Sequence, residues 1–164
     1  MAIDPESPLG RLLSAPIRPG EVGWIGLRRE RKAPMEVVRS ATLVAGRGIE
    51  GDHYDSRRNG PRQVTLIAEE DLGAMAGFLG RPVEPGQLRR NIMVRGVNLI
   101  ALKDRRFRIG GALLEYSGPC EPCGRIETNL GPGGYNAARG RAGITARVLE
   151  GGEVRVGDAV TRVD

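Results

Sequence analysis

The sequence has few of the side chains that nucleic-acid sites and membrane segments need. Aromatic residues make up only 4% of the 164 residues, with a single tryptophan and a single histidine. This leaves little for base stacking, and no nucleic-acid recognition motif is present. No apolar run approaches the roughly 18 residues of a membrane span. We therefore expect neither a nucleic acid nor a membrane as a partner.

Cysteine is almost as scarce, with two residues in the chain. No signal-peptide pattern precedes them, so the sequence predicts a cytoplasmic location, where thiols stay reduced. Two cysteines in that setting indicate a chemical role and not a disulfide scaffold.

Positive charge is plentiful and unevenly placed. The net charge is +5, and the segment from Arg81 to Arg108 alone holds eight basic and two acidic residues. Nearly all the basic residues are arginine, whose planar fork matches phosphate and carboxylate. For most of them we favour the plainer explanation of a GC-rich genome that encodes basic residues as arginine, and Arg89 and Arg90 are open to interpretation as a solvated strand end.

Short apolar segments separated by glycine-rich turns dominate the rest of the chain. We count eight or more short strands, and one amphipathic helix is expected from Ala68 to Leu79. Evenly spaced short strands favour a barrel over an alternating βαβ sheet. The sequence therefore predicts a mainly β fold, a closed or nearly closed barrel with one or two short helices. We expect a single domain over residues 21–164 after a flexible arm at residues 1–20.

The two cysteines form a Cys-x-x-Cys pair, Cys120 and Cys123, bracketed by Pro119, Pro122 and Gly124. The proline rings fix φ and disfavour a regular helix or central strand here. We expect a tight loop after the strand Ala112 to Tyr116, with thiols that a ligand can reach.

A second glycine-rich loop, Gly46 to Tyr54, holds Asp52 and His53. Its glycine spacing fits neither a Rossmann nor a Walker loop. For His53 a hydrogen-bonded polar residue is the plain alternative to a ligand, and Asp52 can simply form the turn.

Six segments follow one another along the chain in a family-like order. They are Gly48-Ile-Glu-Gly-Asp52, Arg62-Gln-Val-Thr-Leu-Ile67, Arg89-Arg-Asn-Ile92, Leu102 to Gly110, Gly118-Pro-Cys-Glu-Pro-Cys123 and Gly143 to Gly157. Taken together and in this order they resemble MOSC domains, the family named for the C-terminal domain of molybdenum-cofactor sulfurase. The resemblance extends from about Gly20 to Val160, and it implies a β-barrel and a site for a molybdenum–molybdopterin cofactor or for cysteine-borne sulfur.

The resemblance also assigns roles to individual residues. The family's metal-binding or sulfur-carrying cysteine falls on Cys123, which is therefore the predicted catalytic residue and molybdenum ligand. The family's cofactor-proximal Arg-x-Asn-Ile segment falls on Arg89 and Asn91. His53 stands one place earlier than the histidine of many members, which leaves its role open. The predicted cofactor-binding residues are Arg62, Arg89, Asn91, Asp52, His53, Cys120 and Arg125.

Residue chemistry agrees with these assignments, since molybdenum and persulfide both need a soft thiolate. The implied activities are sulfur transfer and reduction of an N-hydroxylated substrate, with a sulfur donor or an electron-transfer protein as partner; pyridoxal phosphate binding also stays open. The alternatives are a non-catalytic carrier of cofactor or sulfur, a redox dithiol, and a zinc site completed by His53 and a carboxylate.

Overall fold

A closed barrel forms the centre of the fold in the computed structural model, which describes residues 2–163. Within those residues seven strands close the barrel, because β1 pairs with both β6 and β11. In spatial order they are β1 (Gly20–Leu27), β11 (Ala159–Val163), β7 (Arg106–Ile109), β8 (Ala112–Pro119), β9 (Ile144–Glu150), β5 (Val64–Ala68) and β6 (Ile92–Arg95). The mainly β barrel predicted from the sequence is confirmed.

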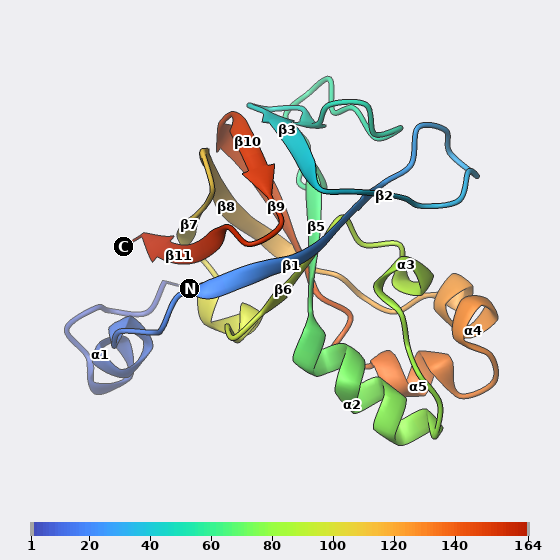
Figure 1. The fold of residues 1–164 in the computed structure, drawn as a ribbon. Coiled ribbons are helices and arrows are strands. Elements are labelled where there is room, and N and C mark those ends of the chain that lie inside the picture. Colours follow the sequence, from blue (N-terminus) through green and yellow to red (C-terminus); the bar gives the residue numbers. More distant parts are fainter. Residues whose placement is uncertain (1, 164) are drawn as a thin grey trace.

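Four further strands lie outside the ring. The end of β1 also pairs with β2 (Glu36–Val38). A small second sheet holds β10 (Gly152–Arg155), β3 (Ser40–Val44) and β4 (Gly48–Ile49). β3 and β10 lie at the top of Figure 1, and β4 leads into the turn that carries Asp52 and His53.

The strands β5 and β6 are the one parallel pair in the barrel, and they are buried on both faces. Leu66 and Ile92 point into the barrel core, whereas the next residues, Ile67 and Met93, join a second core under the helices. Side chains alternate between the two faces of a strand, so two continuous apolar runs serve two hydrophobic cores at once.

Helices α2, α3, α4 and α5 gather on one side of the barrel (Figure 1), whereas α1 and η1 lie apart from them. The predicted amphipathic helix is α2 (Glu69–Leu79), which connects β5 to β6. Shorter pieces join it: α1 (Pro8–Ser14), α3 (Pro85–Leu88), η1 (Leu99–Leu102), α4 (Gly124–Leu130) and α5 (Gly134–Ala138). The structure thus has more helices than the one or two expected. The short ones were not predicted because four to seven residues are too few to show a helical period. None of the helices within residues 2–163 is long and apolar enough to cross a membrane.

Local capping explains why the four residues of α3 form a helical turn although they begin with proline and glycine. Pro85 occupies the first helical turn, and the Glu84 backbone N–H donates to Gln87 Oε1 at 2.8 Å. A fixed φ and a satisfied end group together stabilise even a single turn.

The helix α1 lies inside the segment predicted to be a flexible arm. The Arg162 guanidinium donates to the carbonyls of Leu13, Ser14 and Ala15, which connects this helix to β11. The flexibility of residues 1–20 stays a prediction.

A carboxylate on α4 joins it to α5 and makes stability depend on pH. Glu127 accepts hydrogen bonds from the backbone N–H groups of Tyr135 and Gly133 at 2.7 and 2.8 Å. These bonds hold the pKa of Glu127 below its usual value. A depressed carboxyl pKa contributes stability above the unfolded-state pKa, near 4.3, and that stability is lost as pH falls through the folded-state value.

We therefore expect Glu127→Gln to melt at a lower temperature than the parent at pH 7, with the difference shrinking as pH falls below the unfolded-state pKa near 4.3. Thermal melts at a series of pH values measure this. Glu121→Gln is the control, because Glu121 is exposed and accepts no hydrogen bond from any described residue. A difference for Glu127→Gln that did not shrink as pH was lowered through the acid range would contradict the assignment.

Candidate functional site

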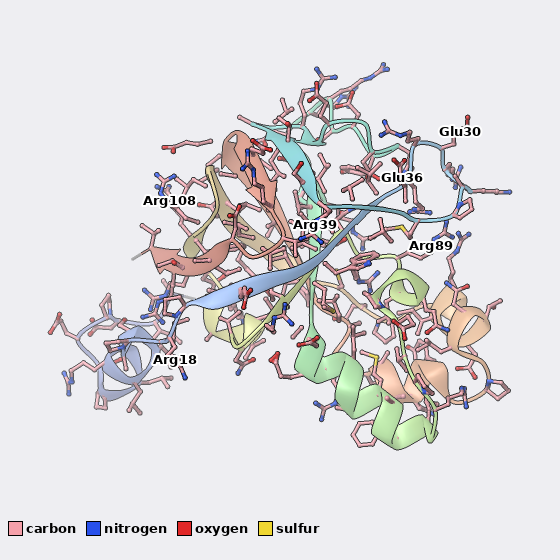
Figure 2. The ribbon with its side chains drawn as sticks, in the orientation of Figure 1. Arg18, Glu30, Glu36, Arg39, Arg89 and Arg108 are labelled. Carbon is pink, nitrogen blue, oxygen red and sulfur yellow. The ribbon has the colours of Figure 1, made fainter. Side chains whose placement is uncertain are left out.

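A cavity of about 280 Å³ opens where the connection after β1 approaches α3 and the start of α4. Its size lies just below the range of roughly 300–1,000 Å³ typical of small-molecule sites. Figure 2 shows Arg89 in this region, between the β1–β2 connection and helices α3 and α4. We call it the arginine cavity; it is lined by Arg28, Arg31, His53, Leu88, Arg89, Arg90, Cys123, Arg125, Ile126 and Asn129.

The two cysteines occupy unlike positions. Cys123 is exposed, lines the arginine cavity and directly precedes α4. Cys120 is half-buried against the second hydrophobic core under the helices, which we call the helix-side core. Its backbone N–H donates to Gly143 O at 2.8 Å. Burial raises the pKa of the Cys120 thiol, although Arg90 and Arg62 act against that shift. Only Cys123 is placed to meet a ligand in this cavity.

Arg89 adopts the left-handed backbone conformation, with φ 59° and ψ 35°. This conformation costs a residue with a side chain roughly 1–2 kcal/mol. Its neighbours hold it there, because Leu88 before it and Asn91 after it are buried. The guanidinium Nη2 donates to Ala33 O at 3.3 Å, so the side chain is aimed across the cavity toward the β1–β2 connection.

Arg90 is fixed by two backbone carbonyls. Its Nε donates to Ala142 O at 2.8 Å and its Nη1 donates to Leu88 O at 3.0 Å. It therefore presents a rigid positive charge to the cavity and to the loop that holds Cys120.

Asn91 has hydrogen-bond partners inside the protein. Its Oδ1 accepts from Thr65 N at 3.1 Å and from Thr65 Oγ1 at 3.0 Å, and its Nδ2 donates to Gly26 O at 3.2 Å. These bonds connect β5 and β1 to the start of β6. Asn91 does not line the cavity, and its role in cofactor binding stays a prediction.

The Asp52–His53 turn makes two hydrogen bonds to the backbone of Arg28. Asp52 Oδ1 accepts from the Arg28 backbone N–H at 2.7 Å, and the His53 backbone N–H donates to Arg28 O at 2.5 Å. The His53 ring lines the cavity, with Nδ1 3.7 Å from Asp52 Oδ1 and without a hydrogen-bond partner among the described residues. Asp52 itself lines a neighbouring hollow of about 270 Å³.

The charged side chains that line the cavity are positive. Five arginines line it, and no carboxylate of the described residues does. Burial, and then the positive charges of Arg89 and Arg125, lower the pKa of Arg28, while Asp52 opposes the shift. Burial and Arg125 likewise lower the pKa of Arg89. A site that brings unpaired guanidinium groups together in this way favours an anionic ligand.

The structure brings four of the predicted site residues to this cavity and leaves four outside its lining. Cys123, Arg89, Arg125 and His53 line it. The other four do not line it: Cys120, Asn91, Asp52 and the exposed Arg62.

Sequence reasoning missed Arg28 and Arg31, which follow β1 in a charged run from Arg28 to Lys32. Such a run reads as a solvated turn, and the similar pair Arg57 and Arg58 lies outside the cavity. What distinguishes the Arg28 run is the contact between Arg28 and the Asp52–His53 turn. That contact joins residues 24 positions apart in the sequence.

The zinc alternative finds no ligand set. Among the described residues no group of three or more histidine, cysteine, aspartate and glutamate side chains could hold a metal ion. A zinc site needs four ligands, or three and a water. A metal at Cys123 must therefore bring most of its ligands with it.

Comparison with known proteins adds a family match. The family model described as MOSC domain matches residues 53–161. No curated protein matches the chain significantly. Among solved structures, the YuaD protein from Bacillus subtilis superposes with a TM-score of 0.75 at 22% identity, covering 87% of this chain and 94% of its own. YiiM from Geobacillus stearothermophilus superposes with a TM-score of 0.69 at 17% identity, covering 89% of this chain and 76% of its own. YiiM from Escherichia coli superposes with a TM-score of 0.66 at 21% identity, covering 91% of this chain and 71% of its own. At these identities the structures show a shared fold.

Proposed function

The chain belongs to the MOSC domain family, and on that premise we propose that it binds a molybdenum–molybdopterin cofactor in the arginine cavity. The observation that supports this is the meeting of one exposed thiol with five arginines in one cavity. Molybdenum favours a soft thiolate ligand, and the anionic phosphate of the pterin favours guanidinium groups. The donor set of the cavity fits both ends of such a cofactor.

In this proposal Cys123 holds the metal, and Arg28, Arg89 and Arg125 hold the phosphate. When bound, the cofactor would supply two-electron redox chemistry. The residues of the chain bind and orient. Arg90 is held by its two carbonyl contacts, and the apolar Leu88 and Ile126 shield the cavity wall from water.

The proposed activities are reduction of an N-hydroxylated substrate and transfer of sulfur carried on Cys123. The first requires an electron-transfer partner and the second a sulfur donor. Both need an accessible thiol, which the exposure of Cys123 provides.

Two measurements on one preparation test the proposal. Protein made in a molybdenum-replete host is analysed for bound metal and cyanide-labile sulfur, and then assayed with an electron donor and an N-hydroxylated base. Metal with turnover supports the reductase, and labile sulfur that moves to an acceptor supports the transferase. Cofactor that binds and leaves without turnover indicates a carrier. Protein that retains neither metal nor sulfur contradicts the proposal.

Arg89 gives the sharpest test of the phosphate end. We expect Arg89→Ala to weaken cofactor binding about ten- to a hundredfold, since a charge-assisted contact contributes roughly 1.5–3 kcal/mol. Folding should change little, because Ala retains the Cβ that makes the left-handed conformation costly. Equilibrium binding and thermal melts of the same samples measure both effects.

Arg106→Ala is the matched control for Arg89→Ala. Arg106 lies on β7, outside the arginine cavity, and pairs with Glu115 at 3.3 Å. It should leave cofactor affinity unchanged. If Arg89→Ala lowered the melting temperature while affinity stayed the same, Arg89 would be a structural residue.

A further inference from the structure

The arginine cavity carries more positive charge than one phosphate group neutralises. Five guanidinium groups line it. A phosphate monoester carries about −1.5 to −2 at neutral pH, so one such group leaves a surplus of about +3. Guanidinium groups stay charged at this pH, so the surplus cannot be removed by losing protons.

Ion pairs within the protein do not remove the surplus either. In the part of the chain that the structure describes, none of the five cavity arginines pairs with a carboxylate. The arginines that do are elsewhere: Arg29, Arg47, Arg95, Arg106, Arg108, Arg141 and Arg155. Other arginines, among them Arg39, Arg62 and Arg139, also lack a carboxylate partner among the described residues, but here five such groups line one cavity.

The unpaired arginines also keep donors available. Arg31 and Arg125 are exposed, and their side chains donate to no described residue. Arg28 and Arg89 each use a single guanidinium nitrogen on a carbonyl, at 3.0 and 3.3 Å. Because one guanidinium fork can bind two phosphate oxygens, two or three arginines already surround one phosphate. Five exceed what a single group can use.

We propose that the arginine cavity binds two phosphate groups at once. Arg28, Arg89 and Arg125, whose charges act on one another, hold the inner group. Arg31, on the exposed connection after β1, holds the outer group. The proposal rests on the proposed function only in identifying the inner group with the cofactor's phosphate.

The second phosphate can come from two sources. Both groups can belong to one ligand as a pyrophosphate, as in a cofactor extended by a nucleotide. Alternatively the outer group is the phosphate of a separate substrate, such as a nucleoside monophosphate.

Calorimetric titration of the protein, freed of small molecules, with inorganic phosphate and with pyrophosphate tests the stoichiometry. We expect two phosphates per chain, and pyrophosphate binding at least about tenfold tighter than phosphate. Arg31→Ala should reduce the count to one phosphate and weaken pyrophosphate binding about tenfold or more. Lys32→Ala is the matched control, because Lys32 is the next exposed cation on the same connection and does not line the cavity.

A single phosphate per chain, pyrophosphate no tighter than phosphate, or equal effects of Arg31→Ala and Lys32→Ala would each overturn the proposal. Two bound phosphates in a protein that retains no molybdenum would leave it standing while the proposed function fails, so the two are separable.

Two further measurements identify the source in molybdenum-loaded protein. Mass spectrometry of the extracted ligand detects a pyrophosphate-bearing cofactor. If the cofactor carries one phosphate, the loaded protein should bind adenosine 5′-monophosphate and not adenosine. A single-phosphate cofactor together with no preference for the monophosphate would also overturn the proposal.

Discussion

Cys123→Ser should abolish almost all metal retention and all cyanide-labile sulfur while the barrel still folds. A serine hydroxyl is a hard donor that stays protonated at neutral pH, so it replaces neither a molybdenum-binding thiolate nor a persulfide carrier. Cys123 is exposed at the cavity and packs in neither hydrophobic core, so the change of one atom should have little effect on stability. Bound molybdenum, labile sulfur and the melting temperature are measured on the same protein.

Cys120→Ser separates the two thiols. Cys120 is half-buried against the helix-side core, and burial raises the pKa of its thiol, which disfavours a free thiolate. We expect this variant to keep much of the metal and sulfur, with a lower melting temperature because a hydroxyl is less suited to an apolar contact. Equal losses in the two variants would indicate a redox dithiol or a metal site shared by both thiols. Full activity in Cys123→Ser would remove the assignment of that residue.

The fold was largely predictable because local pattern and tertiary structure agree. Apolar runs such as Val64 to Ala68 are too short for most helices, are flanked by polar or turn residues and contain β-branched side chains. The helix α2 was predictable from its acidic first turn and apolar spacing. The helix α4 was not, since its beginning at Gly124 follows two prolines that indicate a loop.

The site was less predictable because its charges come from three separate segments. Cys123 and Arg89 were found through a resemblance, and Arg125 through its closeness to Cys123 in sequence. The surplus of charge depends on Arg28 and Arg31, which reach the cavity only when the connection after β1 folds against the Asp52–His53 turn. No periodicity in the sequence reports such a contact.

Asn91 illustrates the opposite difficulty. Its position in an Arg-x-Asn-Ile segment predicted a ligand contact, and the three hydrogen bonds of its side chain go to Thr65 and Gly26. A residue beside a site can be needed to hold the strands that form the site. Sequence position alone does not separate that role from direct binding.

Gly143 should be the least replaceable residue behind the cysteine loop. Its φ is +97°, and a Cβ added there would overlap the Leu66 carbonyl oxygen. Its own carbonyl accepts the Cys120 backbone N–H at 2.8 Å. Gly143→Ala therefore adds backbone strain, forces β5 and β9 apart and moves the anchor of the loop. We expect a loss of about 2–5 kcal/mol, or roughly 5–20 °C in melting temperature.

Gly140→Ala is the matched control for that change, three residues earlier in the same connection. Gly140 also has a positive φ, +76°, but a Cβ there would meet nothing within 4 Å. It should cost about 1–2 kcal/mol, from backbone strain alone. Thiol titration of the folded variants gives a second readout. One cysteine should react readily in the parent and in Gly140→Ala, whereas both should react in Gly143→Ala, because Cys120 loses its anchor. Equal melting temperatures and one reactive thiol in both variants would show that the contact between Gly143 and Leu66 does not hold the loop.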